Sequence, residues 1–384
     1  MRALSAILHA AAAAALLGLS LAGAAAPAPF EARHVTLTGQ RPDGQPVDDV
    51  KMPWFSGADA RAAARINDWL WLTRAASLAP RAPVASVRVA DTSALDASAD
   101  FTVDRADARV LALTISAESC GAYCEPYDQA ERFDARTGRH VTPDELFTPE
   151  GRAALARRLR AETHRRYAQA LKDNRDALAE EKRKPTPDAQ TLEDLQQRIE
   201  LDQRCQGDDG AKPPADKALA AFGYLQVGLV PGRVRLVAGR CGSHAEGGLD
   251  DVGNVGLEID HAALRPQLTP YGRALLLGED AAPGATPGNA IGQVLHGTLG
   301  RTAVTMLLSS DDGRHVSGGY AYDRHGQRIV LEGILAGNRL ALTERSGGRD
   351  PVDVARLALS VAGDRLKGRW IGKDGKTFDV DVGF

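Results

Sequence analysis

Residues 365–383 read RLKGRWIGKDGKTFDVDVG, two runs of alternating apolar and polar residues on either side of the turn sequence KDG. Alternation with a period of two is typical of a half-buried strand, and a glycine-containing turn between two such runs indicates a β-hairpin. The pattern continues through residues 291–384, where about eight strand-like runs are separated by short turns. Because closure removes exposed strand edges, we expect an all-β antiparallel small barrel.

Three aromatic residues of this barrel region are candidates for a ligand or glycan face: Tyr320, Tyr322 and Trp370. Packing in the core or at the rim is the interpretation we favour, because large aromatic side chains are expected in any small core. Small barrels either hold a ligand or fill their interior with side chains. Binding of a small apolar ligand in the barrel therefore stays open as an alternative function.

The chain before the barrel has a different organisation. Residues 276–290 are rich in Gly, Pro and Ala and are expected to form a linker. Residues 30–275 mix strand-like and helical runs, which predicts an α+β domain with helices packed on an antiparallel sheet. The charged stretch from Glu180 to Cys205, interrupted by two prolines, is expected to complete an inserted helical hairpin.

Helix starts in this domain are marked by capping residues. Thr142-Pro143 and Thr148-Pro149 each place threonine at an N-cap and proline at the first helical position, and Glu145 completes a capping box for the first. Ser56 is expected to cap an earlier helix that contains Trp69 and Trp71. These two tryptophans are two positions apart and cannot both face one core, so partial exposure of one is an alternative, but packing of the helix end against a sheet is the interpretation we favour.

The N-terminus and the overall charge suggest the compartment. Residues 1–24 carry Arg2, a short apolar stretch and small residues, which predicts a secretory signal peptide and a periplasmic or secreted protein. No later stretch is long and apolar enough for a transmembrane helix, so none is expected after signal cleavage. The formal net charge of -3 gives no support for nucleic-acid binding.

Four cysteines are present: Cys120, Cys124, Cys205 and Cys241. An oxidising compartment favours disulfides, and we prefer Cys120 with Cys124 and Cys205 with Cys241, because the first pair is local and the second would tie a helical segment to a strand. Zinc binding by Cys120, Cys124, Cys241 and His244 is the alternative, although the spacing matches no standard zinc module. We expect no metal and no cofactor.

Catalytic motifs are not found in the sequence. It has no HExxH, G-x-S-x-G, Walker or Rossmann glycine pattern. Ser243, His244 and Glu246 have the residue types of a triad, but neighbours in sequence rarely take triad geometry. No catalytic residue is therefore assigned, although an envelope hydrolase with a site near His244 and Asp250 remains an alternative.

Several motifs in the first domain, in this order, resemble a known extracellular family. They are MPWFSG (52–57) with INDWL (66–70), RFDARTGRHVTPDELF (132–147), and FGYLQVGLVPGRVRLVAG (222–239) leading to HAEGGLDDVGNVGLEID (244–260). Residues 34–266, apart from the helical insert, are similar to the DUF3298 domain with a DUF4163-like N-terminal part. That family includes a lysozyme-sensing anti-sigma factor and domains beside peptidoglycan deacetylases.

The resemblance implies a non-catalytic cell-envelope binding or interaction protein, with lysozyme or a peptidoglycan-derived glycan as the partner. Where a Gly-Ala-His stretch usually follows the central strand of the family, this chain has SCGAYCEP (119–126). We therefore expect the first cysteine pair to staple a loop that relatives hold by other means. Its neighbours Tyr123, Glu125 and Tyr127 are the expected exposed binding edge, with His244 as a further candidate.

Overall fold

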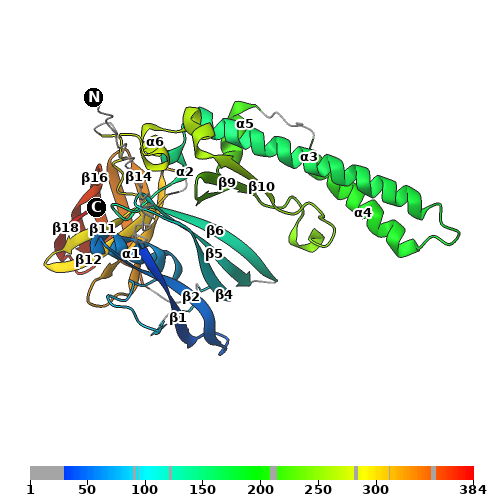
Figure 1. The fold of residues 1–384 in the computed structure, drawn as a ribbon. Coiled ribbons are helices and arrows are strands. Elements are labelled where there is room, and N and C mark those ends of the chain that lie inside the picture. The colour runs from blue at the N-terminus through cyan, green and yellow to red at the C-terminus, as the bar shows by residue number, and fades with distance from the viewer. Residues whose placement is uncertain are drawn as a thin grey trace, which may run out of the picture.

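The computed structural model describes residues 30–89, 92–93, 95–120, 123–207, 214–280, 284–310, 312–346 and 352–384. The expected signal peptide, residues 1–24, lies outside these ranges. The described chain forms an α+β part followed by a closed antiparallel barrel, which confirms the predicted fold class (Figure 1). Within the described ranges, no helix is both long and apolar enough to cross a membrane.

The first sheet has seven strands in the order β3-β1-β2-β4-β5-β6-β7. Its strands are β1 (Phe30–Gln40), β2 (Pro46–Gly57), β3 (Ser86–Arg88), β4 (Ser98–Ala106), β5 (Val110–Cys120), β6 (Cys124–Asp134) and β7 (Arg139–His140). The pairs β1–β3 and β2–β4 are parallel, so the sheet is mixed where the sequence predicted an antiparallel one. The cause is α1 (Ala60–Arg74), which follows β2, because parallel neighbours need a crossover connection.

Strand β5 is buried on both faces over its first half. Leu111 and Leu113 belong to the core beneath α1, whereas Val110 and Ala112 belong to a second core on the opposite face. Successive side chains of a strand point to opposite faces, so the uninterrupted apolar run VLAL packs against two layers at once.

Helix α1 begins after Asp59, whose carboxylate accepts hydrogen bonds from the backbone N–H groups of Arg61 (2.9 Å) and Ala62 (3.0 Å). The expectation that Ser56 caps this helix was wrong, because Ser56 lies in β2 and the chain turns into the helix after Gly57. Asp59 is itself a favoured N-cap residue, so the local chemistry follows the same rule three positions later.

Trp69 and Trp71 are both buried, at 8% and 0% exposure, which agrees with the favoured packing and excludes the alternative that one is partly exposed. The indole N–H of Trp71 donates to the carbonyl of Pro53 in β2 (3.0 Å), and that of Trp69 donates to the carbonyl of Gly292, just before the barrel (3.2 Å). Helix α1 therefore lies between the sheet and the barrel, and each tryptophan packs on a different neighbour (Figure 1).

The remaining helices are α2 (Pro143–Leu146), α3 (Pro149–Glu181), α4 (Ala189–Gln206), α5 (Ala215–Phe222) and α6 (Pro270–Leu277). The predicted capping box of Thr142 and Glu145 is confirmed, as is Thr148 as the N-cap of α3. Helices α3 and α4 form the predicted inserted hairpin, which extends away from both sheets on the side opposite the barrel (Figure 1). The first turns of α3 cover the second core.

A second sheet follows the insert, with the order β10-β9-β8. Its strands are β8 (Gln226–Val230), β9 (Arg233–Ala238) and β10 (Val255–Asp260), accompanied by the short 3₁₀ helices η1 (His244–Glu246) and η2 (His261–Gln267). The hairpin between β8 and β9 turns at Pro231-Gly232, and Gly232 has a φ of 73°, which a glycine adopts without strain.

The C-terminal barrel has eight strands in sequence order, and β11 pairs with β18 to close it. They are β11 (Val294–Leu299), β12 (Thr302–Ser309), β13 (His315–Tyr322), β14 (Arg328–Ala336), β15 (Arg339–Arg345), β16 (Asp353–Ala362), β17 (Arg365–Gly372) and β18 (Thr377–Gly383). Buried side chains such as Met306, Leu331 and Leu357 pack together as its core. This packing gives no support to a small apolar ligand inside the barrel.

Candidate functional site

The two predicted disulfides are confirmed. Cys120 bonds to Cys124 and closes the hairpin of β5 and β6, and Cys205 at the end of α4 bonds to Cys241 after β9. The zinc alternative is wrong, because zinc binds thiolates and all four sulfurs are in disulfide bonds. The second bond anchors the segment between β9 and β10 to the helical insert.

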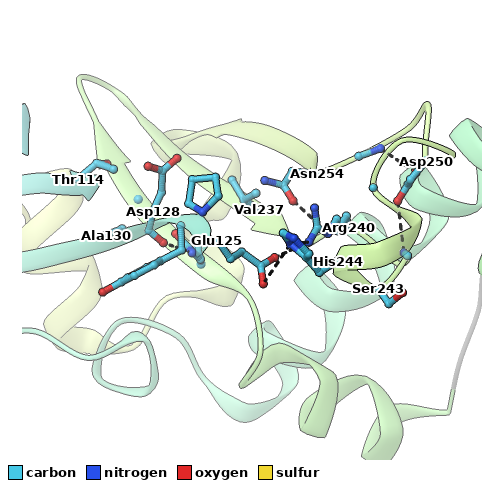
Figure 2. Close-up of a pocket in the computed structure, with 18 of the residues that line it drawn as sticks. Thr114, Glu125, Asp128, Ala130, Val237, Arg240, Ser243, His244, Asp250 and Asn254 are labelled. Carbon is cyan, nitrogen blue, oxygen red and sulfur yellow. Dashed lines mark hydrogen bonds and ion pairs between the residues drawn. The ribbon is translucent and has the colours of Figure 1, made fainter. Parts of the chain in front are cut away.

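A groove of about 730 Å³ opens between the first and second sheets. On β5, Ala112 is in the second core, but Thr114, two residues further on the same face, lines the groove. Gly228 of β8 lines the other side and has no side chain to fill the space. The sheets are therefore packed together at one end and separated at the other, where the segment from Gly239 to Asn254 forms the far wall (Figure 2).

The rim of this groove brings together residues from both sheets. The ring of Tyr123, which is 74% exposed, stacks on the imidazole of His244, with centroids 5.4 Å apart. Glu125 forms an ion pair with Arg240, and its other oxygen lies 4.0 Å from Nδ1 of His244. Figure 2 shows Glu125 pointing from β6 toward Arg240 and His244. The rim thus offers an aromatic face beside a carboxylate and a guanidinium group.

The far wall is held in place by Asp250. Its carboxylate accepts hydrogen bonds from the Tyr167 hydroxyl of α3 (3.0 Å) and from the backbone N–H groups of Gly242, Val252 and Gly253 (3.3, 3.2 and 3.0 Å). Burial raises the pKa of Tyr167, and the neighbouring Asp250 raises it further, so the phenol keeps its proton and stays a donor. Asp250 therefore has a structural role, because it fixes the backbone of the far wall.

Ser243, His244 and Glu246 do not form a triad. The Ser243 hydroxyl and backbone N–H both donate to Glu246 (2.9 Å each), which is a capping arrangement at the start of η1. These hydrogen bonds lower the pKa of Glu246, so it is ionised at neutral pH. A catalytic His244 would need a free serine and a free carboxylate in this segment. Ser243 and Glu246 instead bond to each other and hold the turn.

The structure brings four of the seven candidate binding residues to this groove. Glu125, Tyr127 and His244 line it and Tyr123 stands at its rim. The Tyr127 hydroxyl donates to Asp96 (2.8 Å) and accepts from Arg74 of α1 (2.9 Å), and its ring packs against the core beneath α1, so this side chain is engaged on the other face of the sheet. Burial and Asp96 raise the pKa of this hydroxyl.

The other three candidates belong to the barrel. Tyr320 is buried in its core and Tyr322 packs edge-on against it. The Tyr320 hydroxyl and the indole N–H of Trp370 both donate to the same oxygen of Glu344 (3.0 and 2.6 Å). These contacts agree with the packing role that the sequence favoured, and they place the three residues away from the groove.

Sequence reasoning missed several groove residues. Arg240, Asp128 and Asn254 line the groove, but none of them belongs to a recognisable motif in the sequence. Asn254 accepts a hydrogen bond from the backbone N–H of Arg240 (2.9 Å), which orients that residue toward Glu125. The one available signal was the glycine-rich composition of residues 239–253, which is typical of a loop that lets other groups approach its backbone.

Comparison with protein-family models, curated proteins and solved structures gave no match for this chain. The chemistry of the groove is therefore the basis for assigning a function. It combines an exposed aromatic face, carboxyl groups and a guanidinium group, so it can stack on one part of a ligand while donating and accepting hydrogen bonds with another.

Proposed function

We propose that this chain is an exported, non-catalytic binding protein of the bacterial cell envelope, and that its groove holds a segment of peptidoglycan-type glycan. The observation that carries the proposal is the exposed ring of Tyr123, stacked on His244 at the rim of a polar groove. Sugar rings present C–H groups on one face and hydroxyls at the edge. The aromatic face of Tyr123 can stack on the C–H groups, and the neighbouring Glu125 and Arg240 can form hydrogen bonds with the hydroxyls.

Three further features support binding without catalysis in an oxidising compartment. The carboxylates of Asp250 and Glu246 are engaged with the chain itself, which argues against the hydrolase alternative. Both disulfides suit a periplasmic or secreted protein. The resemblance to the DUF3298 family implies the same class of function.

Lysozyme is the second candidate partner, and the resemblance implies it directly. The exposed carboxylates of Glu125 and Asp128 and the half-buried one of Glu118 lie along the end of the β5–β6 hairpin, and a strongly basic protein would be attracted to such an edge. This attraction would weaken with added salt, whereas stacking of a glycan on Tyr123 would persist.

Calorimetry on the oxidised protein without residues 1–24 tests both partners. The probes are an N-acetylglucosamine tetrasaccharide, soluble peptidoglycan fragments and lysozyme, each at two salt concentrations. We expect the glycans to bind, Tyr123→Ala to weaken their binding about fivefold to tenfold, and Tyr123→Phe to retain it. Tyr224→Ala is the matched control, because Tyr224 is 87% exposed and does not line the groove.

Each outcome separates the candidates. Glycan binding that Tyr123→Ala and Tyr224→Ala weaken equally would remove the groove from the proposal. Lysozyme binding without glycan binding would establish the second candidate. Absence of binding to all three probes would reject the proposed ligand class.

A further inference from the structure

A second cavity, of about 380 Å³, lies at the junction between α1, the segment around β7 and the barrel. Trp69 and Leu72 of α1 and Leu307 of β12 give it apolar walls, and His140 of β7 gives it a polar group. Apolar walls with a few placed polar groups, at the meeting of two structural units, are typical of small-molecule sites. This junction cavity shares no lining residue with the groove.

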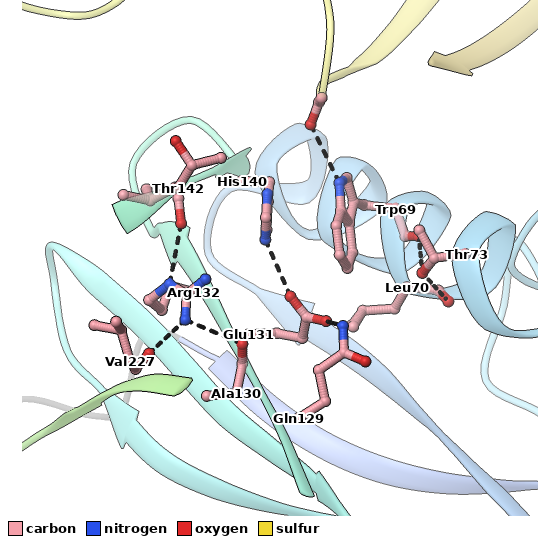
Figure 3. A network of polar contacts seen from close by, with 12 residues as sticks. Trp69, Leu70, Thr73, Gln129, Ala130, Glu131, Arg132, His140, Thr142 and Val227 are labelled. Atoms are coloured by element: carbon pink, nitrogen blue, oxygen red, sulfur yellow. Dashed lines mark hydrogen bonds and ion pairs between the residues drawn. The ribbon is translucent and has the colours of Figure 1, made fainter. Parts of the chain in front are cut away.

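His140 is held rigidly in this cavity. Its Nε2 lies 3.0 Å from a carboxylate oxygen of Glu131, which is 2% exposed, and its ring stacks on Trp69 with centroids 4.0 Å apart and planes at 16°. The side chain of Gln293 binds both the backbone N–H and the carbonyl of His140 (3.0 and 2.9 Å). Figure 3 shows the imidazole parallel to the indole and directed at Glu131.

The carboxylate also decides which nitrogen carries the proton. Glu131 accepts a hydrogen bond from Gln129 (2.7 Å) and lies beside Nε2 of His140, so a neutral His140 donates to it most favourably from Nε2. In that neutral tautomer the Nδ1 atom bears a lone pair, and no hydrogen bond to Nδ1 is seen within the described part of the chain. Because His140 lines the cavity, this lone pair is an oriented acceptor available to a ligand.

Three further polar groups line the cavity. The hydroxyl of Ser310, also in the cavity wall, is buried and has no hydrogen-bond partner among the described residues. Asp144, an exposed carboxylate, stands in the lining as another acceptor. Arg328 is the cation of the lining, and it donates to the carbonyl of Leu72 (3.0 Å). The lining therefore offers both donors and acceptors, and the acceptors, Asp144, the Ser310 hydroxyl and Nδ1 of a neutral His140, suit a ligand with a hydroxyl or amino group.

We propose that the junction cavity binds a small molecule with an apolar body and a hydroxyl or amino group that donates to Nδ1 of His140. The volume is at the lower end of small-molecule sites, which occupy roughly 300–1,000 Å³, so the ligand is about the size of a substituted aromatic ring. The apolar body packs against Leu72 and Leu307. The ligand would bridge α1 and the barrel. This proposal does not depend on glycan binding in the groove.

Phenol and anisole form a matched pair of probes, because they share a ring and only phenol can donate a hydrogen bond. Protein with ¹⁵N-labelled histidine would be titrated with each at about pH 8, where an ordinary imidazole is neutral. The His140 signals are identified by their loss in His140→Phe, which keeps a ring beside Trp69. We expect the Nδ1 signal to be that of an unprotonated nitrogen and to shift when phenol is added. We expect the protein to bind phenol about fivefold more tightly than anisole.

Two variants make the test specific. Thr73→Trp adds bulk at an exposed position of α1 that lines the cavity, so it should abolish the phenol shift without disturbing the core. In His140→Phe, which retains the apolar walls, the preference for phenol over anisole should disappear. The proposal is overturned if Nδ1 carries the proton, if phenol leaves its signal unmoved at millimolar concentration, or if anisole moves it equally.

Discussion

Tyr123 and His244 stack with their ring centroids 5.4 Å apart and their planes at 24°. Tyr123 immediately precedes β6 of the first sheet, and His244 belongs to η1, which follows β9 of the second sheet. The stack thus joins the two sheets at the rim of the groove, and the ion pair of Glu125 with Arg240 joins them a second time.

The Glu125–Arg240 pair is expected to matter for binding more than for folding. Half of the Glu125 side chain and 30% of that of Arg240 are exposed, so water screens their attraction. We predict a coupling energy of about 0.5 kcal/mol in a double-mutant cycle with Glu125→Gln and Arg240→Met, measured by urea unfolding. Each single variant should weaken glycan binding in calorimetry. A coupling above about 2 kcal/mol would contradict this and make the pair structural.

The two disulfides should differ in their effect on stability. Cys205 and Cys241 are 36 positions apart and Cys120 and Cys124 only 4, and a longer loop loses more chain entropy when it is closed. Replacing Cys205 and Cys241 by alanine should lower the free energy of unfolding by about 4 kcal/mol, against about 2 kcal/mol for replacing Cys120 and Cys124. Urea unfolding of both double variants checks the order, and equal losses would refute the entropic explanation.

Asp202 is expected to destabilise the insert. It is fully buried, one oxygen accepts from Asn174 (2.8 Å), and the other has no partner within the described residues. Burial raises its pKa, and the carboxylates of Asp251 and Asp250 raise it further. A carboxyl whose folded pKa exceeds its unfolded value costs stability once it ionises, so Asp202→Asn should stabilise the protein by about 1 kcal/mol at neutral pH.

Thermal unfolding measured across pH tests this prediction. The advantage of Asp202→Asn should shrink as the pH falls through the raised pKa, because the wild-type carboxyl then takes up its proton. Asp173→Asn, at an exposed position of the same hairpin, is the control and should change stability by less than about 0.5 kcal/mol. A variant less stable than the wild type at neutral pH would show that Asp202 is satisfied.

His296 of β11 should make stability fall in mild acid. Burial, together with Arg65, lowers its pKa to about 4, and its Nδ1 lies 3.0 Å from the Thr305 hydroxyl. Between about pH 6.5 and 4 this histidine is protonated in the unfolded chain but not in the folded chain. The free energy of unfolding therefore falls by up to about 3 kcal/mol as the pH falls through that window. Comparing urea unfolding of wild type and His296→Gln isolates this contribution. Parallel pH profiles for the two proteins would exclude it.

Local sequence signals were sufficient for much of the fold. The barrel follows from period-two alternation and short turns such as KDG, and the start of α3 follows from Thr148-Pro149. The preferred disulfide pairing is also the one found, although the closeness of Cys120 and Cys124 in the chain only favoured it over the two other pairings. These features depend on neighbours in the chain, and so the sequence carries them directly.

The candidate site was only partly predictable. Tyr123 and Glu125 were expected at an exposed edge and His244 was expected separately, but nothing in the sequence indicated that they meet at one groove. Arg240 was missed because an arginine after a strand is ordinary until its partner is known. His140 and Glu131, in two adjacent strands, gave no motif at all.

The sequence by itself determined the element types, the caps of α2 and α3 and the barrel, because these depend on backbone propensity and short-range spacing. The tertiary structure alone decided that β2 and β4 are parallel, that Trp69 and Trp71 are both buried, and that the groove and the junction cavity exist. Those outcomes depend on which face of each helix or sheet is covered by another layer of the structure. Burial of α1 and β5 on two sides is a property of the packed layers that neither segment shows alone.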